Sequence, residues 1–427
     1  MMVDTIRYGP PRMPHRLGTV IAVDLGNTNS CVAGYGATAG DETAPPMFRL
    51  CIPTSVAFTG DGAVLVGEAA KNHPAAISGF KRLLETRFDS PEVRRAAEHL
   101  PYKIVDWCSR THIEVNGGGA ARSMYAADVA SMVIAELKAR AAGRRSTTPS
   151  SPSPTTSRTA HVEAAMNAAR MAGLMTVRII DEPTAAAVSH GLHHRLRDRG
   201  NVLVLHVGGG TSAATVLTYE NAVFEALASH HDLHLGGDDF DGRIANHFTQ
   251  LIKHSHGVDI ADDDLAFTNL KSQCELAKKT LSSQATAQVN LHTNLANGGV
   301  LSFSGSLTRA QFEELNHDLF QKVISLVDTA MAETKRAAGF DVIDEVVLVG
   351  GSARIPRIRE LVKNYFDGKD ATAASIGGGE AVVVEPEEAV VHGGGLLSHP
   401  MEDGYHCMGA GGRRQIGSPM DRCYHEI

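Results

Sequence analysis

The chain has 427 residues, which is enough for two or three ordinary domains or for one large fold of two lobes. Hydrophobic residues make up 43% and charged residues 21%, a balance typical of a soluble globular protein. The formal net charge of -8 argues against a nucleic-acid partner. No apolar run approaches the length of about 20 residues that a membrane span needs, so we also expect no membrane-embedded segment.

Apolar strand-like runs alternate with amphipathic segments along the chain, and this order predicts an α/β architecture. Three apolar runs that end near glycine are expected to be strands: 20–23, 202–205 and 346–349. Three segments with apolar residues at helical spacing are expected to be helices: 238–256, 265–281 and 308–338. The first of these helices has a predicted apolar face made of Phe240, Ile244, Phe248, Leu251 and Ile252. Thr308 and Gln311 match a capping box, which predicts a marked start for the last helix.

One segment interrupts the α/β pattern. Every residue of 146–159 except Arg158 is Ser, Thr or Pro, a low-complexity composition that offers little apolar surface to a core. Its three prolines lack the backbone N–H that a central strand donates. We therefore expect this segment to be exposed and mobile, although its backbone could still follow the path of a strand.

The two ends of the chain are expected to lie outside the folded domain. Residues 1–18 carry three arginines but no apolar h-region, which argues against a secretory signal, and their few hydroxyl residues argue against a transit peptide. Residues 398–427 are rich in Gly, His and Arg and show no periodicity, so we expect a disordered tail there. No retention signal ends the chain, and the sequence predicts a cytoplasmic location.

Cysteine and histidine residues give no clear sign of a metal or redox site. The six cysteines lack the spacing of such sites, and free thiols are expected in a reducing cytosol: Cys31, Cys51, Cys108, Cys274, Cys407 and Cys423. Histidines gather at 190–194 and at 230–234. Because no cysteine or regular helical spacing accompanies these two clusters, we interpret them as incidental surface histidines.

Three glycine turns carry residue types that bind phosphate. Glycine lets backbone N–H groups approach phosphate oxygens, a hydroxyl adds a donor, and an acid at the end of a strand can hold Mg²⁺ through water. Residues 24–28 (DLGNT) and 208–211 (GGGT) have this chemistry, each after an apolar strand. Residues 350–356 (GGSARIP) form a third turn, where a helix begins and a sugar or phosphate could meet backbone amides. The two similar strand–turn units suggest two similar lobes that face one cleft.

Several longer stretches carry a family resemblance. They read GEAAKN at 67–72, KRL at 81–83, RIIDEPTAAA at 178–187, HLGGDDFD at 234–241, FEELN at 312–316 and VLVGGS at 347–352. On these motifs the chain resembles the nucleotide-binding half of the 70-kilodalton heat-shock chaperones from about residue 20 to residue 397.

The resemblance implies a two-lobed, actin-like ATPase fold of the ribonuclease-H-like type, over residues 19–397. Lobe I would comprise 19–198 and 386–397, lobe II would comprise 199–385, and ATP or ADP with Mg²⁺ would lie in the cleft between them. The implied protein partners are J-domain co-chaperones and nucleotide-exchange factors, and the implied oligomeric state is a monomer.

The resemblance also implies roles for individual residues. Asp24 would organise Mg²⁺, and Glu182 would lie near the metal. Thr28 and Thr211 would give their hydroxyl groups to phosphate. Lys71 would place a positive charge beside the γ-phosphate, which stabilises phosphoryl transfer electrostatically.

A larger set is expected to contact the nucleotide. On one face of a helix, Glu275, Lys278 and Ser282 would turn toward adenosine. The full expected set is Gly26, Asn27, Thr28, Asn29, Gly208, Gly209, Gly210, Thr211, Gly236, Gly237, Asp238, Glu275, Lys278, Lys279, Ser282, Gly350, Gly351, Ser352, Arg354 and Glu387.

The chain departs from the family pattern where the attacking water would lie. The family has two aspartates there, and this chain has His206 and Ala213. A positioned acid or base is worth roughly 10²- to 10⁴-fold in rate, and a histidine can accept a proton but cannot replace an anion beside magnesium. Asn27 and Asn29 also replace a threonine and an aromatic residue of the family.

The sequence therefore leaves three functions open. The protein could be a slow ATPase of heat-shock type, a nucleotide-binding module that no longer hydrolyses ATP and binds co-chaperones, or the product of a damaged gene. The family's peptide-gripping β-sandwich and lid have no counterpart after residue 397, so we expect no substrate-binding domain and no peptide binding.

Overall fold

The computed structural model describes residues 20–35, 47–84, 86–97, 100–117, 120–142, 148–153, 159–174, 177–196, 199–261, 263–295, 298–368 and 384–398. The predictions for the tails 1–18 and 398–427 lie outside these residues, apart from Ser398, which ends the last described helix. Among the helices described, none combines the length and the apolar character that crossing a membrane would require.

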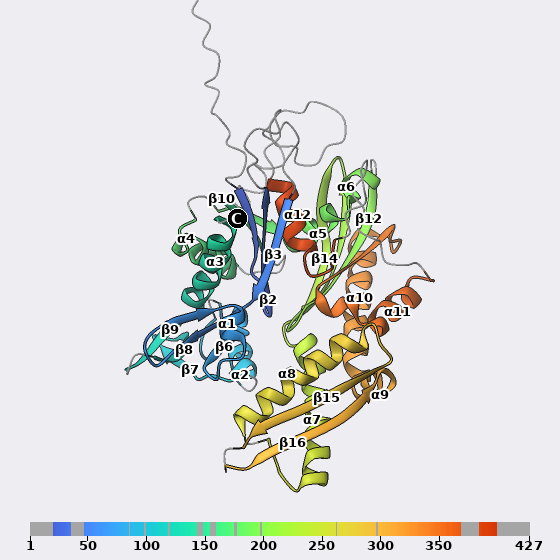
Figure 1. The fold of residues 1–427 in the computed structure, drawn as a ribbon. Helices are drawn as coiled ribbons and strands as arrows, with labels where there is room; N and C mark the ends of the chain where they lie inside the picture. Colours follow the sequence, from blue (N-terminus) through green and yellow to red (C-terminus); the bar gives the residue numbers. More distant parts are fainter. Residues whose placement is uncertain are drawn as a thin grey trace, which may run out of the picture.

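A five-stranded sheet forms the first part of the fold (Figure 1). Its strands, in spatial order, are β11 (Ile179–Asp181), β10 (Thr148–Ser153), β1 (Val20–Asp24), β2 (Asn29–Tyr35) and β3 (Met47–Pro53). The neighbouring pairs β11–β10 and β10–β1 are parallel, whereas β1–β2 and β2–β3 are antiparallel. Helices α3 (Ala126–Ala142) and α4 (Thr159–Met171) pack against each other, and α3 also contacts this sheet.

The prediction that residues 146–159 avoid the sheet is wrong for their described part. Thr148–Ser153 forms β10, which lies between β1 and β11 with Pro149 opposite Ile21 and Pro152 opposite Ile180. Proline removes one ladder donor but its fixed φ is compatible with extended backbone, so the parallel ladders on both sides can still hold the segment. The alternative that the backbone follows the path of a strand is the one that the structure supports.

A four-stranded sheet forms the second part of the fold. Its order is β14 (Val223–Asp232), β13 (Ser212–Glu220), β12 (Arg199–Val207) and β17 (Glu345–Val349), with β12 and β17 parallel and the other neighbours antiparallel. The strands predicted at 20–23, 202–205 and 346–349 are therefore confirmed, within β1, β12 and β17. Helix α10 (His317–Ala338) packs on β13 and β14.

Two helices lie between the sheets. Helix α12 (Ala389–Ser398) packs on the five-stranded sheet, α5 (Glu182–Ser189) packs on the four-stranded sheet, and the helices contact each other (Figure 1). Their crossing is close, since a Cβ on Gly393 would lie 1.8 Å from the carbonyl oxygen of Ala185. Only glycine at position 393 allows the two backbones to approach this far.

A helical subdomain extends below the four-stranded sheet in Figure 1. It contains α7 (Gly237–His256), α8 (Asp264–Leu281), the hairpin β15 (Thr286–Asn294) and β16 (Val300–Thr308), and α9 (Arg309–Leu315). The capping box of Thr308 and Gln311 is confirmed. The helix predicted over 308–338 is two helices, because the chain leaves helical geometry at Asn316, whose side-chain amide donates to the carbonyl oxygen of Phe312 at 2.9 Å.

Many of the remaining elements lie below the five-stranded sheet in Figure 1, and the last of them contacts α10. They are β4 (Ser55–Phe58), β5 (Val64–Val66), α1 (Glu68–Lys71), β6 (Ala76–Ser78), the 3-10 helix η1 (Phe80–Leu83), α2 (Pro91–Ala97), β7 (Ile104–Trp107), β8 (Arg110–Gly117), β9 (Ala120–Tyr125), α6 (Leu192–Arg195), the 3-10 helix η2 (Gly351–Arg354) and α11 (Pro356–Tyr365).

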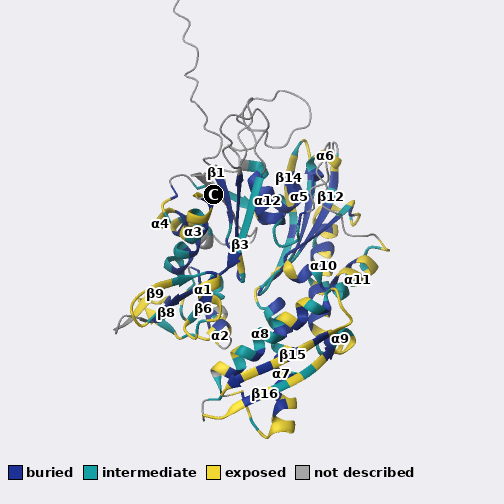
Figure 2. Ribbon diagram, in the orientation of Figure 1, coloured by how far each residue is buried: buried dark blue, intermediate teal, exposed yellow. Residues whose placement is uncertain are grey.

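Buried residues follow both sheets and the inward faces of the helices (Figure 2). Separate hydrophobic clusters fill the two parts, one drawn from residues 21–174 and another from residues 203–362. On α7 the predicted apolar face is confirmed at Phe240, Ile244, Phe248 and Ile252, which are fully buried. Leu251 is instead 43% exposed, because it lies at the edge of that face.

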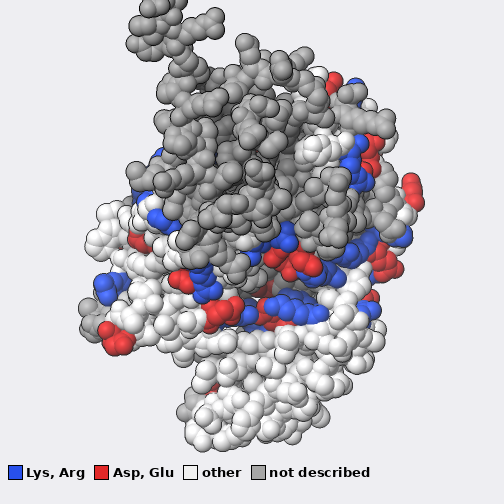
Figure 3. All heavy atoms as spheres, turned by 45° about the horizontal axis from the view of Figure 1, so that its top comes forward, with Lys and Arg blue, Asp and Glu red and all other residues white. Residues whose placement is uncertain are grey.

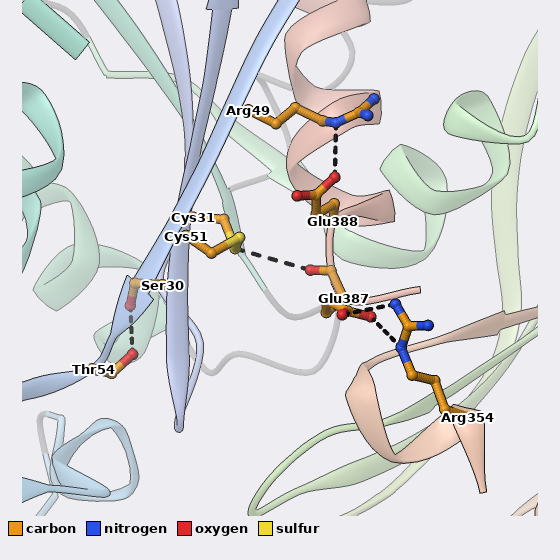
Figure 4. The surroundings of a disulfide bond; sticks show 8 residues. All are labelled: Ser30, Cys31, Arg49, Cys51, Thr54, Arg354, Glu387 and Glu388. Atoms are coloured by element: carbon orange, nitrogen blue, oxygen red, sulfur yellow. Dashed lines mark hydrogen bonds and ion pairs between the residues drawn. A yellow bond between two sulfur atoms is a disulfide. The ribbon is translucent and has the colours of Figure 1, made fainter. Parts of the chain in front are cut away.

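A disulfide joins β2 to β3, which corrects the prediction of free thiols at these positions. Cys31 and Cys51 are directly opposite each other in the antiparallel ladder, and their sulfurs are bonded (Figure 4). Cys108 and Cys274 are free, as predicted. Cys407 and Cys423 lie outside the described residues.

Two histidines are buried where α5 meets α12. His190, predicted as a surface residue, is 4% exposed, and His392 is 2% exposed. Burial, together with the charges of Arg49 and His190, lowers the pKa of His392 to about 4. Burial also lowers the pKa of His190.

These depressed pKa values predict a loss of stability in acid. An unfolded histidine titrates near 6.5, so below that pH the unfolded chain binds more protons, and the free energy of unfolding falls as pH drops from 6.5 toward 4. At pH 5.5, one unit below the pKa of about 6.5 in the unfolded chain, His392 alone is expected to lower the free energy of unfolding by about 1.4 kcal/mol. Urea denaturation at pH 7.5 and 5.5 measures this, and His392→Phe should remove that part of the pH dependence. An unchanged dependence in the variant would contradict the assignment.

Candidate functional site

The glycine turns of the two sheets meet each other. A Cβ on Gly209, in the β12–β13 turn, would lie 1.8 Å from Thr28 Oγ1 in the β1–β2 turn. A Cβ on Gly210 would lie 2.2 Å from Asn27 Nδ2 and from an Arg82 guanidinium nitrogen. The predicted phosphate turns around 26–28 and 208–210 are therefore brought together, and glycine is needed at position 209, where a Cβ would also lie 2.6 Å from Thr28 Cβ.

The N-terminus of α7 lies against the same turn. The backbone N–H of Gly237 donates to the carbonyl oxygen of Gly208 at 3.0 Å, and that of Asp238 donates to Gly209 at 2.6 Å. Gly236 precedes this helix, and a Cβ there would lie 2.6 Å from the Gly209 carbonyl oxygen. The positive end of a 20-residue helix is thus directed at the turn, which favours a negatively charged group nearby.

The turns also contain a hydroxyl group that could donate to phosphate. Thr28 Oγ1 is buried and has no hydrogen-bond partner among the described residues; Asn27 Oδ1 is unpaired there too, but an amide oxygen only accepts, so it suits a donor such as water rather than phosphate. An unpaired buried polar atom costs about 1–3 kcal/mol, and a bound ligand, ion or water is one way in which a native protein satisfies it. A hydroxyl donor beside backbone N–H groups fits the nucleotide phosphates that the sequence predicts.

Asp24, Glu182, Lys81 and His206 form a charged cluster beside the turns. Glu182, at the start of α5, accepts from Lys81 Nζ at 3.3 Å and lies 3.3 Å from His206 Nδ1. Burial alone would raise the pKa of Glu182, but the charge of Lys81 and the hydrogen bond from His206 lower it to about 2. Burial, reinforced by the charge of Glu182, raises the pKa of Asp24 to about 6.

The cluster can accept a cation that arrives with phosphate. No three His, Cys, Asp or Glu side chains of the described part converge as a ready-made metal site. Mg²⁺ is usually held by one or two carboxylates together with phosphate oxygens and waters, so Asp24 suits this ion once a nucleotide is bound. A nearby Mg²⁺ would also favour the charged form of Asp24.

The structure places Lys81, rather than Lys71, beside Asp24 and Glu182. Lys71 ends α1 and pairs with Glu275 Oε2 on α8 at 3.2 Å, so it joins the first part of the fold to the helical subdomain. Lys81 lies on η1, whose neighbouring Phe80 is fully buried and directs this short helix inward. Lys81 belongs to the KRL motif at 81–83, whereas the charge beside the γ-phosphate was predicted for Lys71 of GEAAKN, and that role of Lys71 stays a prediction.

On α8 the predicted residues are present but engaged with one another. Lys278 is 8% exposed, and its Nζ donates to Asp241 Oδ2 at 2.6 Å and to the Gly237 carbonyl oxygen at 2.8 Å. Glu275 accepts from Lys279 at 2.6 Å as well as from Lys71. Ser282 caps the helix. Lys278 therefore ties α8 to the start of α7, which supports the glycine turn.

The third glycine turn joins the same region. Gly350 has φ of +87°, and a Cβ there would lie 2.4 Å from the Val207 carbonyl oxygen, so glycine is needed at this position. Nothing lies within 4 Å of a Cβ on Gly351. Ser352 Oγ donates to the Gly208 carbonyl oxygen at 2.9 Å, and Arg354 is held by Glu387 at 2.9 and 3.0 Å.

Of the other predicted residues, Thr211 closes its turn, because its backbone carbonyl oxygen accepts from the Gly208 N–H at 2.9 Å. Asn29 is exposed at the start of β2. His206 and Ala213 are directly opposite each other in the β12–β13 ladder. Cross-strand partners lie on one face of a sheet, so the two positions that lack the family's aspartates are side by side.

Acidic and basic side chains are intermingled in a band across the face seen in Figure 3. The candidate site draws on the ends of β1 and β12, on the turns that follow these strands, and on α5, α7, α8 and η2; the contacts of Lys81 and Arg82, on η1, were not predicted from the sequence. The geometry suits the binding of a phosphorylated ligand near Asp24, Thr28 and Gly209.

Comparison with known proteins gives one consistent assignment. A family model described as Hsp70 protein matches residues 20–399. A curated relative, the heat shock 70 kDa protein BIP3 of Oryza sativa subsp. japonica, is 41% identical over 390 residues, which is 89% of this chain and 56% of the relative. The chain thus spans about half the length of the curated relative that it matches, and it belongs to the Hsp70 family.

Proposed function

We propose that the protein binds ATP or ADP with Mg²⁺ in the cleft between two lobes, and that it hydrolyses ATP slowly. Membership of the Hsp70 family and the mixed α/β architecture support an actin-like ATPase fold and an ATP-binding, chaperone-like function. The lobe boundaries remain those of the sequence prediction, 19–198 with 386–397 and 199–385. The observation that carries the proposal is the meeting of the two glycine turns around the unpaired Thr28 Oγ1.

The residues of the site would have different roles in binding the nucleotide and the metal. Backbone N–H groups of the turns, with Thr28 and Thr211, would hold the phosphates, and Asp24 would hold the hydrated metal. Mg²⁺ would neutralise charge on the transferred phosphoryl group. Lys81 is the better candidate than Lys71 for the positive charge near that group, because it lies with Glu182 beside Asp24.

Slow hydrolysis is expected from the two facing residues His206 on β12 and Ala213 on β13. His206 is engaged with Glu182, and Ala213 carries no polar group. The same pair favours a second candidate function, a nucleotide-binding module that binds J-domain co-chaperones or nucleotide-exchange factors without useful turnover. We also propose that the protein is a monomer and is located in the cytoplasm.

Stabilisation by nucleotide tests the binding proposal. A ligand at 100 times its Kd stabilises a protein by about 2.7 kcal/mol, so millimolar ADP with Mg²⁺ is expected to raise Tm by several degrees. Adenosine should raise Tm much less, because the proposed site contacts phosphate. A Tm that is the same with and without ADP would contradict nucleotide binding, whereas equal shifts with adenosine would contradict the phosphate site.

A further inference from the structure

The disulfide lies against the segment that connects the candidate site to α12. Cys31 Sγ is 4.0 Å from the backbone carbonyl oxygen of Glu387 (Figure 4). The side chain of Glu387 points the other way, toward Arg354 of η2, and accepts two hydrogen bonds from it. One residue therefore contacts the disulfide through its backbone and the third glycine turn through its carboxylate.

Residues 384–388 are fixed from both sides. Toward the five-stranded sheet, the carboxylate of Glu388 accepts from Arg49 Nε at 2.8 Å. Arg49 lies on β3, two residues before Cys51. Toward the candidate site, the carbonyl oxygen of Pro386 accepts from the Gly350 N–H at 2.9 Å. The segment links the strands that carry the disulfide to the turn whose backbone is predicted to meet the nucleotide.

The surroundings of the disulfide leave little room for change. Cys31 packs with Ala22, Ala33 and Val391, which are fully buried, and with the partly buried Met47. The sulfur atoms of two thiols must lie farther apart than the bonded sulfur atoms of a disulfide. In a close-packed interior, the extra volume displaces the neighbouring residues. The neighbours here are α12, which contains Val391, and the Glu387 backbone.

Chemical access to the bond is from one side. Cys51 is partly exposed, whereas Cys31 is 2% exposed. A thiolate of an external dithiol would attack Cys51 Sγ, breaking the S–S bond and releasing Cys31 as a thiolate that takes up a proton. The second thiol of the reductant then attacks the mixed disulfide and releases Cys51, so the protein gains two electrons and two protons and the reductant becomes a disulfide.

We propose that Cys31 and Cys51 form a reversible thiol–disulfide site, and that reduction by a dithiol weakens nucleotide binding by loosening residues 384–388. This inference rests on the proposed function. Cytosolic disulfides are usually transient and redox-sensing, so the proposal agrees with a cytoplasmic location in which oxidation switches the site to its tighter form.

The test compares ADP affinity in the two redox states. The full chain carries Cys108→Ser, Cys407→Ser and Cys423→Ser, so that Cys31, Cys51 and the buried Cys274 are its only cysteines. Samples oxidised with glutathione disulfide or reduced with dithiothreitol are titrated with ADP and Mg²⁺, and mass mapping verifies the Cys31–Cys51 bond. Reduction is expected to raise the Kd by about fivefold or more, which is the lower end of typical coupling between sites.

A variant separates the disulfide from other effects of the reductant. Cys51→Ser, or Cys51→Ala if the serine variant does not fold, should bind ADP as weakly as the reduced protein under both conditions. ADP binding with the same Kd in both redox states, or no bond after oxidation, would overturn this inference and leave the proposed function standing. No ADP binding in either state would instead overturn the proposed function, and this inference with it.

Discussion

ATP turnover is expected to rise by about 10²-fold when His206 and Ala213 are both replaced by aspartate, since a positioned acid or base is worth roughly 10²- to 10⁴-fold. The two positions are opposite each other in the β12–β13 ladder, so the new carboxylates would lie side by side near Asp24 and Glu182. Single-turnover hydrolysis with Mg²⁺ measures the effect. The unmodified protein should be slower, by a similar factor, than a family chaperone that retains both aspartates.

The matched control replaces both residues with asparagine, which has nearly the volume of aspartate and no charge. His206→Asn with Ala213→Asn should leave turnover near that of the unmodified protein. If the unmodified protein already hydrolyses ATP at the rate of a chaperone with both aspartates, the assignment of these two positions to the water site is wrong.

Gly209→Ala is expected to weaken nucleotide binding by about 10- to 100-fold. A Cβ at this position would lie 1.8 Å from Thr28 Oγ1, so the two turns must separate. Inserting a methyl group into close-packed structure typically costs about 1–3 kcal/mol, and this range of affinity is expected because nucleotide binding would require the two turns to stay in contact. Titration with ADP and Mg²⁺ measures the change, and circular dichroism shows whether the fold is retained.

Gly242→Ala provides the control for this prediction. Gly242 lies within α7, outside the predicted nucleotide contacts, and nothing lies within 4 Å of a Cβ built there, so alanine should fit. The affinity for ADP is expected to stay within about twofold of the unmodified protein, because surface substitutions usually change free energies by less than about 0.5 kcal/mol. Equal losses in both variants would show that steric contact between the turns is not what governs binding.

Much of the fold could be predicted from local sequence, because the strands within β1, β12 and β17 are continuous apolar runs. Strand β10 could not, since its prolines are depleted in strands, its serines offer little apolar surface, and its place depends on the ladders of β1 and β11. The break at Asn316 was also missed, because apolar spacing continues through it from α9 into α10.

Motifs in the sequence predict the backbone turns of the candidate site, but they do not predict the side-chain contacts around those turns. The glycine turns around Gly26, Gly209 and Gly350 were identified from residue type alone. Lys71 and Lys81 both stand in family-like motifs, and only the inward direction of η1 distinguishes them. The Cys31–Cys51 disulfide depends on the register of β2 against β3, which the spacing of cysteines along the chain does not reveal.

Calorimetric titration of the full chain with ADP tests the central claim most directly. With Mg²⁺ present, the account predicts saturable heat with one ADP bound per chain, and weaker binding when EDTA removes the metal, since Asp24 and the phosphates would share the ion. Gly209→Ala should lose most of this heat at the same concentrations. No heat at millimolar ADP with Mg²⁺, from protein shown by circular dichroism to be folded, would contradict the claim that this is a nucleotide-binding member of the family.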